Sequence, residues 1–412
     1  MKNFNNFYKA AGTLLLVAFM GLCLAAYFGI NPALAAVGLF MVGLIPRPAN
    51  AFFMATPDTT NIANYFGKVA PRLFATVLNK MDIAKDIPLI TNVKNKLKLT
   101  RLIINGEPKP YTGVHNAQDN DIAYSGRDLV VDAFQRDLLI MPSKYRLTYL
   151  SDFRDPGEGT NNKSIPFVQF TYNRIVEEQA AAFNNKTAFF GVGTAAFAAY
   201  SGAATYAVGD LVTFTTGGEL QYWKAIATTS AGQSPDTHPA KWLKANALAI
   251  TKGLGTILKA DRANSVIPAA NVASTGAITG ADALAQVKAI WRKLPDAVKA
   301  QGAEMNMART IGEYLLDDIE TKLSKYTEKD NSGTLYLPGT DGKCAIKIRS
   351  WMSGSGMVFA TPRENLMMGT DLLTDLSTPT FIPDVYTIKG GYSGVMGFNY
   401  QDENVLAIND QN

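Results

Sequence analysis

The chain is predicted to have an α+β fold, and three patterns in the sequence predict it. Apolar residues recur at helical spacing near residues 165–190 and 280–323. Apolar and polar residues alternate near residues 101–153 and 343–349, as they do in half-buried strands. Two short apolar runs flank a proline turn within residues 357–371.

The composition excludes several classes of protein. A chain of 412 residues can hold two or three domains and a sizeable core. The net charge is +4, and basic and acidic residues are mixed throughout, so there is no clustered basic face of a dedicated nucleic-acid binder. Cys23 and Cys344 lie far apart in different contexts, which argues against a disulfide and fits a reducing compartment. His115 and His238 cannot build a histidine-rich metal site, so no metal or cofactor is expected.

Residues 1–53 form an apolar N-terminal segment with no charged residue between positions 10 and 46. One interpretation is a signal peptide that starts with Lys2 and Lys9 and is cut after a small-residue site near position 35 or 51. A second is a membrane hairpin made of two apolar runs separated by Asn31-Pro32. The third is an apolar arm that packs on protein or is removed during assembly. Hydropathy alone favours the membrane interpretations.

Residues 54–100 mix short amphipathic pieces with loops and are predicted to form an N-terminal arm. Residues 101–160 contain the runs DLVVDAF and RDLLIM, followed by YRLTYL. This alternation, bounded by glycine, asparagine and aspartate, predicts a long β-hairpin.

Residues 161–195 contain one long amphipathic helix. Pro166 suits a helix start, and the run EEQAAA favours helix formation. Its apolar face is expected to comprise Val168, Tyr172, Val176, Ala180 and Phe183.

Two further helices are predicted in residues 248–412. The first spans residues 280–301, with Thr279 as its N-cap. The second starts at Thr310, where Thr310 and Glu313 match a capping box. The apolar faces comprise Leu284, Val287, Ile290, Trp291 and Leu294 in the first helix, and Ile311, Leu315, Ile319 and Leu323 in the second. The segment CAIKIR predicts a strand, and VYTIKGGYSGVMGFNY predicts strands around glycine-rich turns.

Residues 196–247 have a different character and predict a small all-β module. LVTF and QYWKAIAT are expected strands, joined by a hairpin turn at Gly217-Gly218. The order of Tyr206, Gly209-Asp210, Tyr222 and Trp242 resembles small chitin-binding carbohydrate-binding modules.

Trp223 is the candidate binding residue of this module. Aromatic rings can stack on sugars, but Tyr206, Tyr222 and Trp242 are more readily explained as the core of a tiny domain. Trp223 neighbours Tyr222 on one strand and should therefore face the opposite side. It is the residue expected to contact a glycan or a partner, or to pack on the rest of the chain.

Motifs for catalysis are not found in the sequence. There is no P-loop and no Gly-x-Ser-x-Gly elbow, and His238 is interpreted as a solvated turn residue. The adjacent pairs Glu177-Glu178 and Asp317-Asp318 are interpreted as solvated helix surface, because neighbours on a helix do not face each other. The chain is not expected to be an enzyme.

The stretch MVFATPRENLMMGTD, residues 357–371, is the most informative of the chain. Pro362 fixes its own φ and keeps Thr361 out of the helical region, so a turn must join the two apolar runs. This stretch, with PFVQFTYNRIVEEQ, KADRANSVIPAANVASTGAIT and LYLPGT, resembles tailed-phage major capsid proteins of the Hong Kong 97-like fold, in the branch of Bacteroidetes phages. The resemblance covers residues 54–195 and 248–405, and residues 54–57 resemble a natural start of such a protein. The resemblance therefore favours an assembly or processing role for residues 1–53 over the membrane interpretations.

The resemblance implies an extended loop in residues 101–160, a spine helix in 161–195, and an axial and peripheral domain core in 248–412. It also implies that Leu294-Pro295-Asp296 interrupts or ends a helix turn. It implies a virion shell of hexamers and pentamers, assembled in the host cytoplasm with scaffold, portal and decoration or head-fibre proteins around double-stranded DNA. Contact with packaged DNA would be weak and non-specific. The alternative is a membrane-anchored or exported carbohydrate-binding surface protein, which leaves residues 248–412 unexplained.

Overall fold

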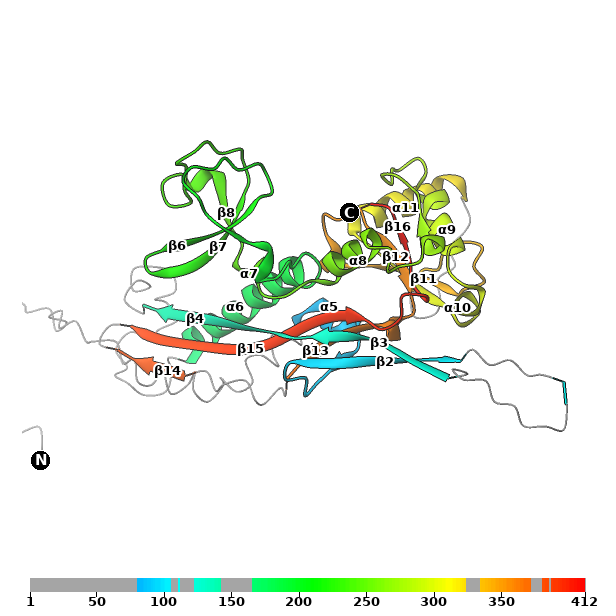
Figure 1. The fold of residues 1–412 in the computed structure, drawn as a ribbon, viewed down its shortest axis with the longest axis horizontal. Helices are drawn as coiled ribbons and strands as arrows, with labels where there is room; N and C mark the ends of the chain where they lie inside the picture. Colours follow the sequence, from blue (N-terminus) through cyan, green and yellow to red (C-terminus); the bar gives the residue numbers. More distant parts are fainter. Residues whose placement is uncertain are drawn as a thin grey trace, which may run out of the picture. The chain divides into compact units, whose positions relative to one another are not determined.

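The computed structural model describes residues 80–104, 110–111, 122–141, 165–323, 334–371, 380–384 and 387–411. Within these ranges the chain forms two five-stranded sheets, a two-stranded hairpin and a separate four-stranded sheet (Figure 1). The predictions for residues 1–53 and for nearly all of the N-terminal arm lie outside them. No helix in the described ranges is long and apolar enough to cross a membrane.

The order of elements mixes helices and strands, as the α+β prediction requires. The strands are β1 Leu89–Ile90, β2 Lys96–Ile104, β3 Ile122–Val130, β4 Asp132–Ile140, β5 Ala198–Ala199, β6 Leu211–Thr216, β7 Glu219–Ala225, β8 Trp242–Lys244, β9 Val272–Ala273, β10 Ala303–Met307, β11 Cys344–Ile348, β12 Val358–Thr361, β13 Leu366–Thr370, β14 Thr380–Pro383, β15 Ile388–Tyr400 and β16 Ala407–Asn409. The helices are α5 Asp82–Asp86, α6 Ile165–Ala182, α7 Asn246–Ala249, α8 Leu254–Ala263, α9 Ala283–Arg292, α10 Asp296–Gln301 and α11 Arg309–Lys322.

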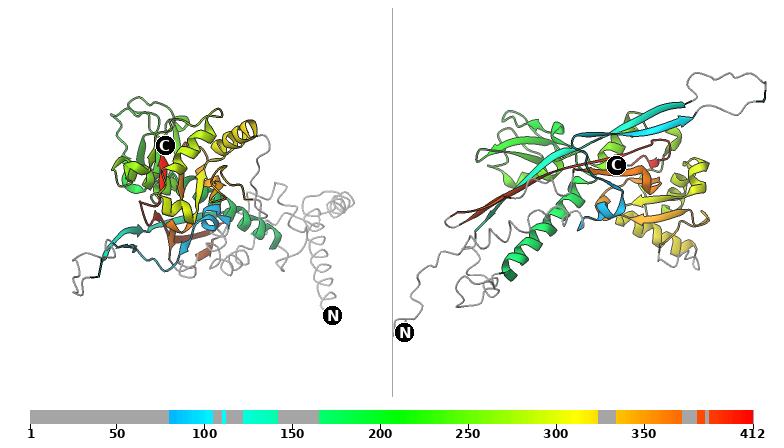
Figure 2. Two further views of the ribbon diagram at one scale, coloured as in Figure 1. Left: turned by 90° about the vertical axis from the view of Figure 1, so that its right-hand side faces the viewer. Right: turned by 90° about the horizontal axis from the view of Figure 1, so that it is seen from below.

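The first sheet is organised by the long strand β15. Its C-terminal part pairs with β13, which also pairs with β1, and its N-terminal part pairs with β14 on one edge and β4 on the other. A core of apolar side chains lies on this sheet and includes Phe134, Val176, Phe183, Trp351, Met396 and Phe398. The long helix α6 (Figure 2) contributes Val176 and Ala180 to this first core, which confirms part of its predicted apolar face. The side chains of Val168 and Tyr172 lie outside the described part.

The second sheet has the strand order β11-β10-β12-β16-β9. Its own core includes the predicted faces of α9 and α11, among them Val287, Ile290 and Leu315. Strand β12 serves both cores, because Phe359 lies in the first core and its neighbours Val358 and Ala360 lie in the second. A strand that is buried on both faces has apolar residues at consecutive positions, which explains the sequence VFA at residues 358–360.

The proline turn in residues 357–371 is confirmed. Strand β12 ends at Thr361, a 3₁₀ turn covers Arg363–Asn365, and β13 begins at Leu366. The side-chain amide oxygen of Asn365 accepts hydrogen bonds from the backbone N–H groups of Gln401 and Asp402. The two apolar runs belong to different sheets, so this turn connects the two cores.

The predicted helix over residues 280–301 is two helices. Leu294-Pro295 separates α9 from α10, because proline cannot continue the helical hydrogen bonding. The N-cap prediction for Thr279 is wrong, since α9 starts at Ala283 after Asp282 and has no side-chain cap from that residue. The capping box is also wrong: α11 begins at Arg309, and Thr310 lies inside the helix.

Asp318 corrects a further prediction. It is 4% exposed, whereas its neighbour Asp317 is on the surface as expected. Its carboxylate accepts a hydrogen bond from the N–H of Leu284 in the first turn of α9, at 2.9 Å, and pairs with Lys322. Burial alone would raise the pKa of Asp318, but these bonds to the ionised form hold it below its usual value. Helix α9 is therefore capped by a side chain from α11.

A long β-hairpin is present in the predicted region, as the pair β2–β3, but it begins before residue 101 and does not include the run RDLLIM. Strand β3 pairs along its whole length with β2, which starts at Lys96 inside the predicted arm. Strand β4 follows β3 after the single residue Val131 but pairs with β15. The run DLVVDAF thus spans the end of a hairpin and the start of a sheet strand.

The glycine-rich segment near the C-terminus is one continuous strand of 13 residues, β15. Its glycines do not make turns. At Gly397, a Cβ atom would lie 2.0 Å from the backbone oxygen of Val130, so the residue allows β3 to pass directly against β15.

Residues 198–244 form a four-stranded sheet in the order β5-β6-β7-β8. Gly217 and Gly218 both have positive φ and make the predicted two-residue hairpin turn. The chain leaves and rejoins the rest at one place: Val192 forms a β-bridge with Lys252, and the Gly253 N–H donates to the Gly191 oxygen at 2.8 Å. These four residues are called the neck.

Candidate functional site

The hairpin β2–β3 presents an apolar surface that nothing in the described part of the chain covers. Cross-strand partners share a face, which places Leu102 opposite Tyr124 and Ile104 opposite Ile122 on the same side of the ribbon. These four side chains are 51–76% exposed. They are called the tip face.

The base of the hairpin contrasts sharply with its tip. Leu99 and Leu129 are buried, at 5% and 0% exposure. An isolated two-stranded hairpin is only marginally stable in water. The exposed apolar tip therefore depends on a firm attachment at the base and is suited to contact another molecule.

The attachment uses an arginine from each strand. Arg101 of β2 donates to Asp402 at 2.8 Å and to Glu403 at 2.9 Å. Arg127 of β3 pairs with Asp261 of α8 and lies over the ring of Tyr400, 4.0 Å from its centroid.

Tyr400 completes this cluster. Its hydroxyl donates to the same Asp261 carboxylate oxygen at 2.7 Å. Burial makes the largest contribution to raising the pKa of Tyr400, and the bond to Asp261 raises it further. The hydroxyl therefore keeps its proton and remains a donor. Asn399 also donates to the backbone oxygen of Asp128, at 2.7 Å. The cluster Arg101, Arg127, Asp261, Asn399, Tyr400, Asp402 and Glu403 is called the hairpin clamp.

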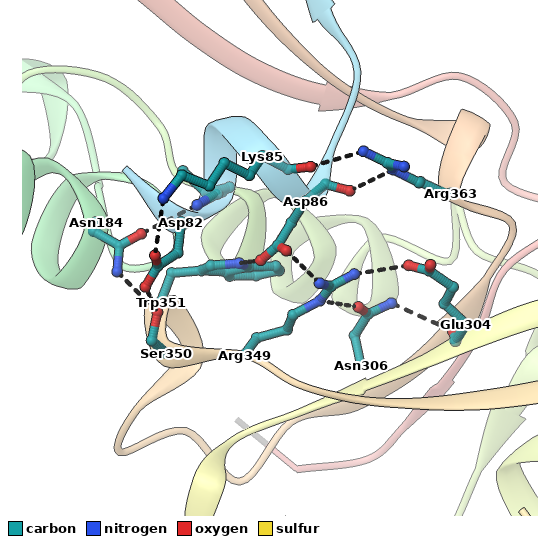
Figure 3. A network of polar contacts seen from close by, with 11 residues as sticks. Asp82, Lys85, Asp86, Asn184, Glu304, Asn306, Arg349, Ser350, Trp351 and Arg363 are labelled. Atoms are coloured by element: carbon teal, nitrogen blue, oxygen red, sulfur yellow. Dashed lines mark hydrogen bonds and ion pairs between the residues drawn. The ribbon is translucent and has the colours of Figure 1, made fainter. Parts of the chain in front are cut away.

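A second polar network surrounds helix α5 (Figure 3). Arg349 is 6% exposed and lies between two carboxylates, with 2.6 Å to Asp86 and 2.7 Å to Glu304. Its Nε also donates to Asn306. The Asp86 carboxylate accepts a further bond from the indole N–H of Trp351, at 2.8 Å.

Both ends of α5 are capped by side chains from distant segments. The N–H of Ile83 donates to Asn184, and the Asp82 carboxylate accepts a bond from Ser350. At the other end, Arg363 donates to the backbone oxygens of Lys85 and Asp86, at 2.7 and 2.8 Å. Figure 3 shows these groups converging on the helix from several strands and turns. The set Asn184, Arg349, Ser350, Trp351 and Arg363 is called the α5 socket.

Trp223 lies on the opposite side of its sheet from Tyr222, as predicted. Tyr222 packs with Phe197 in one small cluster, whereas Trp223 packs with Tyr206 and Trp242 in another. The predicted core of Tyr206, Tyr222 and Trp242 is therefore wrong for Tyr222, because strand alternation puts Trp223 and not Tyr222 on the side of Trp242. Trp242 is 3% exposed, which supports a core role, and Trp223 is only partly buried. The indole N–H of Trp223 is buried without a hydrogen-bond partner. Its expected contact with a glycan or a partner stays a prediction.

The remaining candidate groups have structural surroundings. His238 is exposed and bonds to its neighbour Thr237, which confirms a turn position, and His115 lies outside the described residues. Glu177 and Glu178 form exposed ion pairs with Arg174. No group of three or more potential metal ligands occurs among the residues that the structure describes.

Three known structures show what the chain is similar to. It aligns with a chain of the satellite phage P4 procapsid that includes the size determination (Sid) protein, at 13% identity and a TM-score of 0.47, covering 86% of this chain and 97% of that one. It aligns with the SrpI encapsulin complex of Synechococcus elongatus PCC 7942 at 10% identity and a TM-score of 0.40, covering 80% and 86%. The capsid of an empty GTA particle gives 10% identity and a TM-score of 0.39, covering 80% and 89%.

Comparison by sequence finds less. No family model matches the chain, and no curated protein does. Similarities with identities and TM-scores this low do not assign a function to the chain.

Proposed function

We propose that the chain is a shell subunit, the major capsid protein of a tailed phage with a Hong Kong 97-like fold. The tip face carries this proposal: four exposed apolar side chains sit on a two-stranded ribbon whose base is held by buried leucines and partly buried ion pairs. A surface of this kind gains stability only when a partner covers it. A second copy of the chain is the partner that a shell supplies.

The residues that suggested a capsid protein have positions that agree with this role. The proline turn of residues 357–371 joins the two cores through β12 and β13, so it is architectural and carries no reactive group. The contact between a tip face and a different surface of the next copy is heterologous, and such contacts form rings when the rotation from one copy to the next closes. Rings of six and five copies would close an icosahedral shell around double-stranded DNA.

The proposal extends to partners and location. Assembly would take place in the host cytoplasm with scaffold, portal and decoration or head-fibre proteins, and the product would be part of the virion. The inner surface would touch DNA weakly, because the net charge of the chain is only +4. A carbohydrate ligand would bind at the module, with Trp223 as the contact.

The test is negative-stain microscopy of the full chain expressed with the scaffold protein of its phage. We expect closed shells or sheets of hexamers. Monomers that need detergent to stay in solution would contradict the shell and support the membrane-anchored or exported carbohydrate-binding protein instead. Sequencing the N-terminus of the particle protein would then establish whether residues 1–53 are retained.

We further propose that the four-stranded module is an insertion that assembly does not need. Its two ends meet at the neck, where Val192 and Lys252 form a β-bridge. Replacing residues 193–251 by a glycine-serine linker of about four residues, which can close such a bridge, is expected to leave shell formation intact. The variant loses the bond from Thr187 to the Ala247 oxygen and the bond from Thr251 to Asp132, each worth about 1 kcal/mol. It also loses the packing of Ile250 on the first core. If the variant is insoluble and forms no shells, the module is an integral part of the fold.

A further inference from the structure

Helix α5 has only five residues, and its sequence alone cannot keep it helical. It is held because Met81, Ile83 and Ile87 are almost completely buried in the first core and because the α5 socket binds both ends of the helix. The helix therefore exists only as long as the socket holds it.

We propose that α5 is a strap latched by Arg349, and that the latch fixes how far proteolysis from the N-terminal side can proceed. The bond between Lys85 and Asp86 shows the effect. The side chain of Lys85 is exposed and offers the positive charge that a trypsin-like protease requires. The backbone oxygen of Lys85, which such a protease must attack and bind, is bonded to Arg363 at 2.7 Å.

Arg349 is the residue whose loss would open the strap. It is the cation between Asp86 and Glu304, and its side chain is 7% exposed, against 24% and 19% for the two acids. Removing one partner of such a pair leaves uncompensated charge in the interior, which favours the open state strongly. Proteases cut folded chains through such local openings, so the rate of cutting reports the population of the open strap.

The inference does not depend on shell formation. The strap is a property of a single chain. The part of the chain that resists proteolysis begins no later than Met81. Any processing that removes the preceding segment would leave α5 in place, because Lys85 is out of reach while the latch is closed.

The experiment is limited trypsin digestion of the full-length chain, followed by intact-mass measurement and N-terminal sequencing. We expect the parent to give a resistant fragment that starts at or before Met81 and none that starts at Asp86. In Arg349→Met, the fragment starting at Asp86 should form at least about a hundredfold faster. Arg174→Met, which removes exposed ion pairs of α6, is the matched control and should behave like the parent.

Arg363→Met covers the case in which Arg349→Met fails to fold. It removes only the bonds to the α5 carbonyl groups, so circular dichroism should show a folded protein while the Asp86 fragment still forms faster than in the parent. Two results would overturn the inference. One is a parent that is cut after Lys85 as fast as at earlier sites, and the other is an Arg363→Met variant that is cut there no faster than the parent.

Discussion

The double substitution Leu102→Glu and Tyr124→Lys is expected to abolish shell formation while the subunit stays folded. The two residues lie opposite each other on the tip face, at 51% and 76% exposure. Opposite charges at directly facing positions keep a favourable cross-strand pair, so the hairpin itself should lose little stability. An apolar pocket on another copy would instead have to bury two charges, which is strongly unfavourable.

The effect on assembly is large because the same contact is repeated in every copy of the shell. Covering one large apolar side chain stabilises a contact by about 1.5–3 kcal/mol, and every copy in a shell makes the contact. We expect particle yield to fall by at least about tenfold, measured by size-exclusion chromatography and negative-stain microscopy. Thermal unfolding of the unassembled subunit should be unchanged within the error for a surface substitution.

The matched control keeps the tip face apolar. Leu102→Ile and Tyr124→Phe retain size and hydrophobicity and should assemble like the parent. Normal shells from the charged variant would contradict the role of the tip face. They would also leave the proposed function without its main support, because that support is the contact made by the tip face.

The elements that the sequence predicted well are those with local signals. The stripe of Leu284, Val287 and Ile290 recurs at helical spacing and is buried as expected. Likewise, Pro362 dictates a turn through its own backbone geometry, and Gly217-Gly218 dictates a hairpin turn through positive φ. Each of these patterns acts within a few residues, so a single sequence contains it.

The failures are non-local. Strand β4 follows β3 almost directly yet pairs with β15, more than 240 positions later, and no pattern in either segment specifies that register. Capping patterns in the sequence are local, but Asp318 supplies the hydrogen bond to the first turn of α9 from another helix. The glycines of β15 were interpreted as turns because close passage of another strand leaves no signal in their own segment.

The candidate site shows the same division. Strand alternation correctly separates Trp223 from Tyr222, but it does not reveal that Trp223 shares a cluster with Tyr206 and Trp242. Nothing in the sequence marks Arg349, Arg127 or Asp261, because a single charged residue within or beside a helix or strand is typical of a solvated surface. Only the fold reveals that Arg349 is buried, that Arg127 and Asp261 are partly buried, and that all three are paired.

The largest effect on stability is expected from Arg127→Met in the hairpin clamp. The substitution removes the ion pair to Asp261 and the cation–π contact with Tyr400, and it leaves the Asp261 carboxylate largely buried, at 15% exposure, without a cation. We expect the free energy of unfolding to fall by about 3 kcal/mol, measured by urea denaturation of the unassembled subunit.

Two comparisons make the cause of this loss identifiable. Lys96→Met breaks an exposed pair with Asp128 on the same hairpin and should cost no more than about 0.5 kcal/mol. Adding Asp261→Asn to Arg127→Met removes the uncompensated charge, while the amide oxygen can still accept from Tyr400, so part of the stability should return. Because the clamp fixes the hairpin, amide hydrogen exchange in Arg127→Met should rise more in β2 and β3 than in β10 and β12. Equal losses for Arg127→Met and Lys96→Met would show that the hairpin is held by its buried leucines and that the clamp contributes little.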